Sequence, residues 1–222
     1  MKFNKFLLVL LIVIVVDQIS KLLVYNYMEM GWQGEVNVIG GWFKLHYILN
    51  PGMAFGITLF GKFGKLFLSL FRIIAITGLF WFFFDQIKQK AHPAFLFCLA
   101  LILGGAVGNA IDSIFYGVLL EGNVIKGAAT PWLHGQVIDM LYFPLFDGTW
   151  PQWVPKVGGR HFLFFSAIFN IADSCIFIGA VSLLLFHKQI FSPEAEEKAT
   201  ENPAADLAGE TTGESPVISP EA

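Results

Sequence analysis

Four stretches of this chain are apolar over about the length that an α-helix needs to cross a lipid bilayer. They cover about residues 6–25, 66–84, 94–111 and 162–186. A bilayer core of about 30 Å is crossed by roughly 20 mainly apolar residues in a helix. Only 14% of the 222 residues are charged, against about a quarter in soluble domains. We therefore predict an integral membrane protein with four transmembrane helices rather than an ordinary soluble enzyme.

The distribution of lysines predicts how these helices are oriented. Lysines gather before the first span, in the short connection 85–92 and after the last span: Lys2, Lys5, Lys88, Lys90 and Lys188. Basic residues in short loops mark the cytoplasmic side, and four spans place both termini on that side. No small-x-small cleavage site follows the first apolar run, which favours an uncleaved anchor over a removable signal.

The two segments expected on the outer side, 26–65 and 112–161, carry signs of structure. Over 43–49, Phe43, Leu45, Tyr47 and Leu49 alternate with Lys44, His46 and Ile48, the period-two pattern of a half-buried strand. Val36 and Val38 indicate its hairpin partner. Five of the six tryptophans lie outside the spans, and tryptophan settles at the headgroup level. We expect an all-α membrane protein with a small extracytoplasmic β-sheet lying on the membrane surface.

Charge divides the chain into two parts. The net charge of −3 combines a body of +4 with a C-terminal stretch of −7. That stretch is rich in Pro, small and acidic residues and cannot bury enough apolar surface to fold. We predict a membrane domain over residues 1–190 and a disordered acidic cytoplasmic tail over 191–222. The body lacks the basic patches that bind nucleic acid.

Charged residues inside membrane helices are expensive, costing about 2.5–3.5 kcal/mol for a carboxylate, and each one needs a reason. Asp17 and Lys21 are spaced i, i+4, which favours a structural ion pair over direct chemistry. Arg72 lies near the outer start of its span, where a long side chain can reach the headgroups.

Asp173 has no basic residue within one helical turn, although Asn170 precedes it on the same helix face. An unpaired aspartate some ten residues into an apolar span is either protonated and hydrogen-bonded within the bundle or used chemically. Asp139 lies outside the spans between apolar neighbours, which indicate burial. If the two carboxylates converge, they can share a proton as acid and base and activate water, as in an aspartic protease.

Other chemistries lack their sequence signatures. The chain contains no H-E-x-x-H, G-x-S-x-G or S-x-x-K motif, and its five histidines are scattered. We expect no metal site and no cofactor. The glycines of Gly104-Gly105-Ala106-Val107-Gly108 lie in an apolar span and favour close helix packing. Two alternatives remain open: a small transporter or proton relay that uses the intramembrane carboxylates, and a membrane scaffold in which they fix helix packing.

Five short motifs, in order along residues 7–186, carry a family resemblance. They are Val16-Asp17-Gln18-Ile19-Ser20-Lys21, Asn50-Pro51-Gly52-Met53-Ala54-Phe55-Gly56, the run from Gly104 to Asp112, Val137-Ile138-Asp139, and Phe169-Asn170-Ile171-Ala172-Asp173-Ser174. Together they resemble the sequence boxes of the lipoprotein signal peptidases, the bacterial signal peptidase II family. That family is also expected to have four helices and a small surface sheet.

The resemblance implies a membrane aspartic endopeptidase that removes signal peptides from prolipoproteins. It would cut on the amino side of a cysteine that carries diacylglycerol. The two catalytic aspartates of the family map onto Asp139 and Asp173. Residues implied to support this pair and contact substrate are Asp17, Lys21, Asn50, Gly52, Asn109, Asp112 and Asn170.

The implied setting is the bacterial cytoplasmic (inner) membrane, with the active site near its outer face. The expected partners are lipid-modified prolipoproteins and membrane lipids, and we expect a monomer.

The chain departs from the family pattern in three ways. Ser113 stands where an arginine usually follows the aspartate of the third box, and Arg160 or Arg72 are the candidates to replace it. Insertions are expected near 117–135 and 143–160, enlarging the outer surface. The acidic tail is the third addition.

Overall fold

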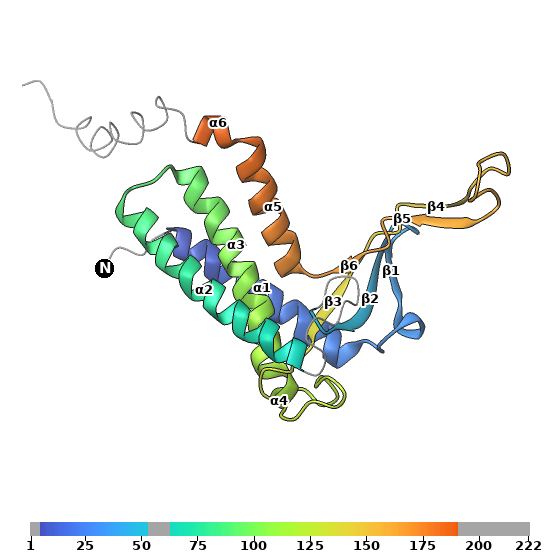
Figure 1. Ribbon diagram of the computed structural model, residues 1–222, viewed down its shortest axis with the longest axis horizontal. Coiled ribbons are helices and arrows are strands. Elements are labelled where there is room, and N and C mark those ends of the chain that lie inside the picture. The colour runs from blue at the N-terminus through green and yellow to red at the C-terminus, as the bar shows by residue number, and fades with distance from the viewer. Residues whose placement is uncertain (1–4, 53–62, 191–222) are drawn as a thin grey trace, which may run out of the picture.

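The computed structural model describes residues 5–52 and 63–190, and its helices form a bundle with a sheet at one end (Figure 1). The helices are α1 (Lys5–Tyr27), α2 (Gly64–Lys88), α3 (Pro93–Ile111), the π-helical turn η4 (Asp112–Tyr116), α4 (Gly117–Leu119), α5 (Ile171–Leu185) and α6 (His187–Ile190), with a short 3-10 turn η1 (Trp32–Gly34). The predicted acidic tail lies outside the described residues.

Within residues 5–52 and 63–190, three helices are long and apolar enough to cross a membrane: Lys5–Tyr27, Gly64–Lys88 and Pro93–Leu119. They contain the first three predicted spans. The predicted fourth helix, over 162–186, begins too early, because α5 starts only at Ile171 and is shorter than the other three. Residues 161–164 and 168–169 are strands instead.

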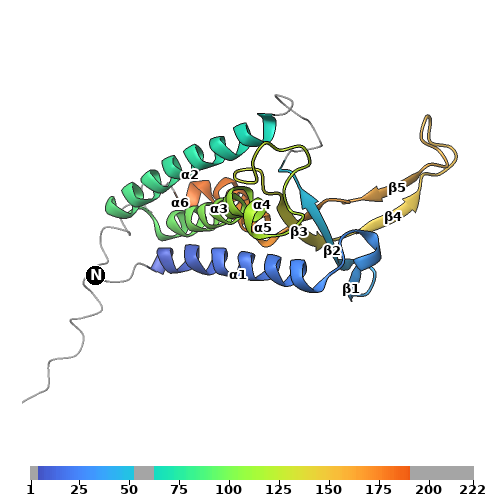
Figure 2. The ribbon, with the colours of Figure 1, turned by 90° about the horizontal axis from the view of Figure 1, so that it is seen from below.

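Helix α3 lies at the centre of the bundle, between α1 and α2 and against α5 (Figure 2). Its glycines allow close approach on two sides. A Cβ at Gly104 would lie 3.0 Å from Val13 on α1, and one at Gly105 would meet the Ala172 carbonyl of α5. The prediction that these glycines allow close helix packing is therefore confirmed.

The main sheet has the strand order β1-β2-β3-β6, with antiparallel neighbours. Its strands are β1 (Val36–Ile39), β2 (Phe43–Asn50), β3 (Val137–Tyr142) and β6 (Ile168–Phe169). The hairpin predicted from residues 36–49 is confirmed. In the register of β2 and β3, Ile48 lies opposite Asp139, and the sheet meets α1 and η4 through β3.

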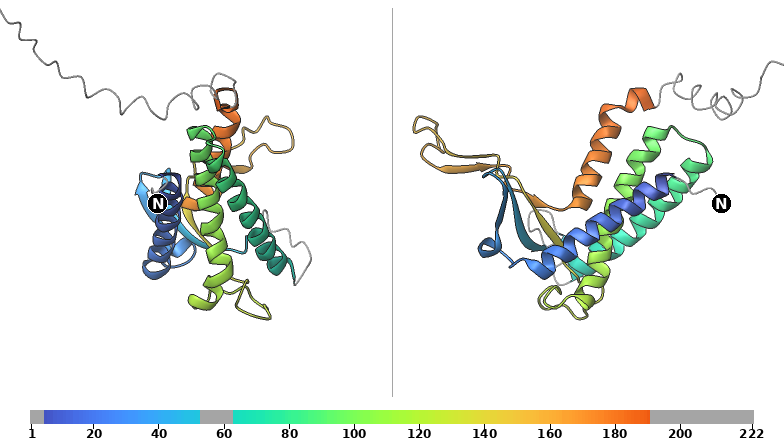
Figure 3. Two further views of the ribbon diagram at one scale, coloured as in Figure 1. Left: turned by 90° about the vertical axis from the view of Figure 1, so that its left-hand side faces the viewer. Right: turned by 180° about the vertical axis from the view of Figure 1, so that it is seen from behind.

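The predicted insertion at 143–160 forms most of a two-stranded arm, β4 (Phe146–Thr149) paired with β5 (His161–Phe164). The arm leaves the sheet sideways and reaches away from the helices (Figures 1 and 3). The other insertion, 117–135, forms a loop closed by a bridge between Val124 and Gly135. This loop lies on the bundle, where Ser69 of α2 donates to the Leu133 carbonyl at 2.7 Å.

Two apolar clusters mark the opposite ends of the bundle. One joins Leu10 of α1, Phe83 of α2, Phe95 of α3 and Ile190 of α6. The other joins Val24 of α1 to residues of β2, β3 and η4. The start of α1, the α2–α3 connection and the end of α5 therefore share one end, and the sheet covers the other.

Close packing of α3 on α5 gives a stability prediction. Alanine at Gly105 would place a methyl group 2.8 Å from Ile176 Cγ1 and against the Ala172 carbonyl, whereas Cβ at Gly78 on α2 meets nothing within 4 Å. We expect Gly105→Ala to lower the unfolding temperature in detergent. We expect Gly78→Ala to leave it unchanged or raise it, since alanine favours helix by about 1 kcal/mol over glycine. Equal stability of the two variants would contradict the packing.

Candidate active site

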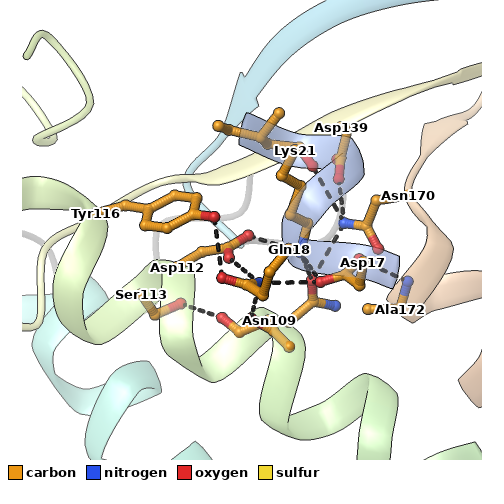
Figure 4. A network of polar contacts seen from close by, with 12 residues as sticks. Asp17, Gln18, Lys21, Asn109, Asp112, Ser113, Tyr116, Asp139, Asn170 and Ala172 are labelled. Atoms are coloured by element: carbon orange, nitrogen blue, oxygen red, sulfur yellow. Dashed lines mark hydrogen bonds and ion pairs between the residues drawn. The ribbon is translucent and has the colours of Figure 1, made fainter. Parts of the chain in front are cut away.

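A fully buried ion network lies where the bundle meets the sheet (Figure 4). Lys21 Nζ on α1 is 2.8 Å from Asp17 Oδ2 and 2.7 Å from Asp112 Oδ2 on η4. The i, i+4 pair predicted from sequence is therefore confirmed. The ion pair between Lys21 and Asp112 was not predicted, because Asp112 lies far from Lys21 in the sequence.

Gln18 completes this network and is a residue that the sequence analysis missed. Its Nε2 donates to Asp17 Oδ2 at 3.1 Å and Asp112 Oδ1 at 3.0 Å, and its Oε1 accepts from the Tyr116 hydroxyl at 2.9 Å. The π-helical turn of η4 holds Asp112, Ser113 and Tyr116 buried together. Such turns often occur at functional sites. The only sequence signal for Gln18 was its position inside the first motif.

Asn109 connects the ion network to the next layer. Its Oδ1 accepts from Lys21 Nζ at 3.0 Å and from Asn170 Nδ2 at 3.1 Å. Its Nδ2 donates to Asp173 Oδ1 at 2.7 Å. One amide therefore joins α1, α3 and the start of α5 without adding a charge.

Asp173 lies in the first turn of α5, so the expectation that it sits some ten residues inside a span is wrong. Asn170 is the N-cap: its Oδ1 accepts from the Asp173 backbone N–H at 2.8 Å, and its own N–H donates to Asp173 Oδ2 at 3.4 Å. This reciprocal capping box starts the helix. A second hydrogen bond joins the same turn to α1, because the Ala172 N–H donates to Asp17 Oδ1 at 2.9 Å.

Asp139 lies on β3 and is 1% exposed, as its apolar neighbours predicted. Asn50 Nδ2 donates to its Oδ2 at 2.9 Å, and Asn170 Nδ2 donates to its Oδ1 at 2.6 Å. Both amides are oriented by backbone donors, since the Gly52 N–H donates to Asn50 Oδ1 at 2.7 Å. Asn170 thus contacts both aspartates.

The environment of Asp139 favours its neutral form. Burial raises the pKa of this carboxyl to about 7, the hydrogen bond from Asn50 opposes the rise, and the negative charge of Asp173 adds to it. Asp173 is only partly buried and lines an apolar groove of about 520 Å³ with Phe165, Phe169, Ser174, Phe177 and Ile178. The two carboxylates therefore lie in different surroundings.

Arg72 of α2 points inward, so the prediction that it reaches for the headgroups is wrong. Its Nη1 donates to Ser113 Oγ at 2.7 Å, and Lys65 Nζ lies 3.3 Å from the same oxygen. A Cβ at Gly52 would lie 2.9 Å from Arg72 Nη2, so the guanidinium packs against that backbone. Of the two candidates to replace the arginine missing at Ser113, Arg72 reaches the site, and Arg160 belongs to the arm.

The buried ion network predicts a large effect of Lys21 on stability. Lys21→Met leaves Asp17 and Asp112 buried without their cation, which costs about 3–5 kcal/mol. Lys44→Met removes the partly exposed pair with Glu35 and should cost about 0–1 kcal/mol. Unfolding titrations in mixed micelles measure both. Equal losses would show that the carboxylates around Lys21 are neutral in the folded protein.

The raised pKa of Asp139 predicts a pH-dependent gain in stability for Asp139→Asn. A raised folded-state pKa gives stability that is complete at low pH and is lost as pH rises to about 7. Asparagine keeps the shape of the side chain without its charge. The unfolding temperature of the variant should therefore exceed that of the wild type by more at pH 8 than at pH 4.5. Asp85→Asn, at the other end of the bundle, is the control and should show no such trend. A gain that does not depend on pH would contradict this environment.

Comparisons with known proteins identify the family of this chain. Residues 9–189 match the family model described as signal peptidase (SPase) II. Two relatives named lipoprotein signal peptidase are similar, from Porphyromonas gingivalis (42% identity, 86% of each chain covered) and Amoebophilus asiaticus (43% identity, 89% of this chain and 84% of the relative covered). A solved bacterial membrane enzyme has a similar fold, with a TM-score of 0.56 and 25% identity over 83% of this chain and 92% of its own. This chain belongs to the signal peptidase II family of proteases.

Proposed function

We propose that this protein is an aspartic endopeptidase that removes signal peptides from lipid-modified prolipoproteins, with Asp139 and Asp173 as its catalytic pair. Its membership in the signal peptidase II family supports the reaction and the substrate class. The observation that carries the aspartic mechanism is Asn170, which hydrogen-bonds to both aspartates at the junction of sheet and bundle. The other site residues predicted from sequence surround this pair as supports.

The mechanism needs one ionised and one protonated carboxyl. The ionised carboxylate accepts a proton from water, whose oxygen attacks the scissile carbonyl carbon, while the protonated carboxyl donates to the carbonyl oxygen. The resulting tetrahedral intermediate collapses when the amide nitrogen is protonated and the C–N bond breaks. The products are a free carboxyl end on the signal peptide and an amine on the lipidated cysteine.

The charges around the pair support a single shared proton. Asp139 and Asp173 both accept hydrogen bonds from Asn170, and burial raises the pKa of Asp139 to about 7. Two ionised carboxylates side by side would also repel each other.

The groove beside Asp173 supports a substrate that arrives from the bilayer. Its walls are almost wholly apolar, and Phe177 and Ile178 are exposed on the outer face of α5. Apolar surface of this kind is stable against lipid. We propose that the diacylglyceryl group of the precursor lies on this side while the scissile bond is presented to the aspartates.

The proposed location is the bacterial inner membrane, with both termini in the cytoplasm and the site near the outer face. The position of the α2–α3 connection, at the same end as the starts of α1 and α6, supports this topology. At the sheet end, Trp153 is 81% and Phe146 64% exposed on the arm, as expected for aromatics at the headgroup level. We further propose that it acts as a monomer without a cofactor.

A transporter or proton relay is not favoured. The family match points to a protease. In addition, Asp17 and Asp112 are held in ion pairs with Lys21, and Asp139 lies on a strand outside the helices, where a relay across the membrane has no use for it.

The proposal is tested by cleavage of a purified diacylglyceryl-modified precursor. We expect Asp139→Asn and Asp173→Asn each to lower kcat by at least about a hundredfold, because general acid–base contributions are typically 10²–10⁴-fold. Asp85→Asn serves as the matched control and should cleave normally. EDTA should leave the rate unchanged. Full activity in either site variant would exclude the pair, and inhibition by chelators would point to a metal.

A further inference from the structure

We propose that Arg72 is a positioning residue of the active site: its guanidinium holds the turn that ends at Gly52, and this turn fixes the amide that donates to Asp139. The amide belongs to Asn50. The inference rests on the proposed function, because it concerns the same site. Arg72 reaches the site from α2, a helix that contributes no residue to the five sequence motifs.

The turn that follows β2 orients the side-chain amide of Asn50. The Gly52 N–H donates to Asn50 Oδ1 at 2.7 Å, a hydrogen bond that closes an Asx-turn. The nitrogen of the same amide, Nδ2, donates to Asp139 Oδ2 at 2.9 Å. The backbone of Asn50 pairs with Val137 of β3, so the sheet already fixes it. The direction of the amide therefore depends on the position of the Gly52 N–H.

Arg72 covers the side of Gly52 on which a side chain would stand. A Cβ built on Gly52 would lie 2.9 Å from Arg72 Nη2 and 3.2 Å from Nη1, so both terminal nitrogens lie against the turn. Gly52 also has a φ of +82°, which glycine adopts without the steric cost that other residues meet. The turn thus requires a residue without a side chain, and the guanidinium occupies the space that a side chain would take.

The guanidinium is itself anchored to the centre of the bundle. Its Nη1 donates to Ser113 Oγ at 2.7 Å, and this hydroxyl donates to the Asn109 carbonyl at 3.0 Å. Ser113 is fully buried in the π-helical turn η4. Arg72 therefore connects η4 to the turn after β2. A planar guanidinium, whose donors have fixed relative positions, can contact both at once, which the single ammonium of lysine cannot do.

The support from Arg72 matters because the two amides that donate to Asp139 are not held equally well. Within residues 5–52 and 63–190, these amides are those of Asn50 and Asn170. Asn170 is held by the capping box of α5 and by a hydrogen bond to α3, whereas the Asn50 amide is held by the bond from Gly52. A shift of about 1 Å in a catalytic group can cost about a hundredfold in rate. Arg72 therefore acts on catalysis through Asn50.

The first test is a double-mutant cycle on the cleavage of a diacylglyceryl-modified precursor. We expect Arg72→Gln to lower kcat by about ten- to a hundredfold with little change in KM, because the substrate still binds beside a misplaced Asp139. In the Asn50→Ala background the same change should cost less than about twofold, since the residue through which Arg72 acts is already gone. Losses that multiply would show that Arg72 acts independently of Asn50 and would overturn the proposal.

Two further variants separate the shape of Arg72 from its charge. Arg72→Lys keeps the positive charge but cannot contact Ser113 and Gly52 together, so it should lose nearly as much kcat as Arg72→Gln. Arg160→Gln removes an exposed arginine of the arm, serves as the control and should cleave normally. Normal cleavage by Arg72→Lys would mean that the charge alone matters, and the positioning role would be wrong.

The second test follows the turn directly and needs no cleavage. In protein labelled with ¹⁵N-glycine, the Gly52 amide signal is identified by its loss in Gly52→Ala. We expect Arg72→Gln to speed the hydrogen exchange of this amide by about tenfold, the effect of losing one hydrogen bond. The amide of Gly78, on the same helix as Arg72, should exchange at an unchanged rate, which would show that α2 remains folded.

An unchanged exchange rate of the Gly52 amide in Arg72→Gln would overturn the proposal, because the turn would then not depend on the guanidinium. If the exchange rate rises as expected while Asp139→Asn still cleaves normally, Arg72 holds the turn and the proposed catalytic pair is wrong instead.

Discussion

The buried ammonium of Lys21 is the interaction on which the sheet end of the bundle depends. It lies between the carboxylates of Asp17 and Asp112 and also donates to Asn109. Removing three ions from water is costly, and only close pairing with further hydrogen bonds offsets that cost. Gln18 and Tyr116 supply those bonds. The network therefore joins α1 to α3 and η4. The two candidate catalytic aspartates lie next to it and are connected to it through Asn109 and Asn170.

Asn170 transfers this rigidity to the aspartates. It ends the extended segment after β6, caps α5 and donates to Asp139. Because its amide is oriented by the Asp173 backbone N–H, the position of one aspartate sets the hydrogen bond to the other. A site built from a strand and a helix N-terminus in this way is held more accurately than one on a free loop.

The surroundings of Asp139 and Asp173 differ because the pair lies between the buried junction of sheet and bundle and an apolar groove. Asp139 is enclosed by the sheet and bundle, whereas Asp173 borders an apolar groove on α5, where Phe177 and Ile178 are exposed. Two carboxyls in unlike environments separate into an acid and a base. Under the proposed function, this position would bring a hydrolytic site within reach of a substrate anchored in the bilayer.

The sequence by itself determined the three long helices, the hairpin from Val36 to Asn50, the close-packing glycines and the Asp17–Lys21 pair. These follow from apolar length, period-two alternation and i, i+4 spacing, all of which are local. The family motifs likewise named most site residues. Only the tertiary structure decided where α5 begins, because the apolar residues 162–164 and 168–169 form strands by pairing with β4 and β3 instead of extending the helix. It also decided that Asp112 joins Lys21, that Gln18 bridges them and that Arg72 turns inward to Ser113. Those contacts join side chains from different helices, and their distances depend on packing that no local pattern encodes.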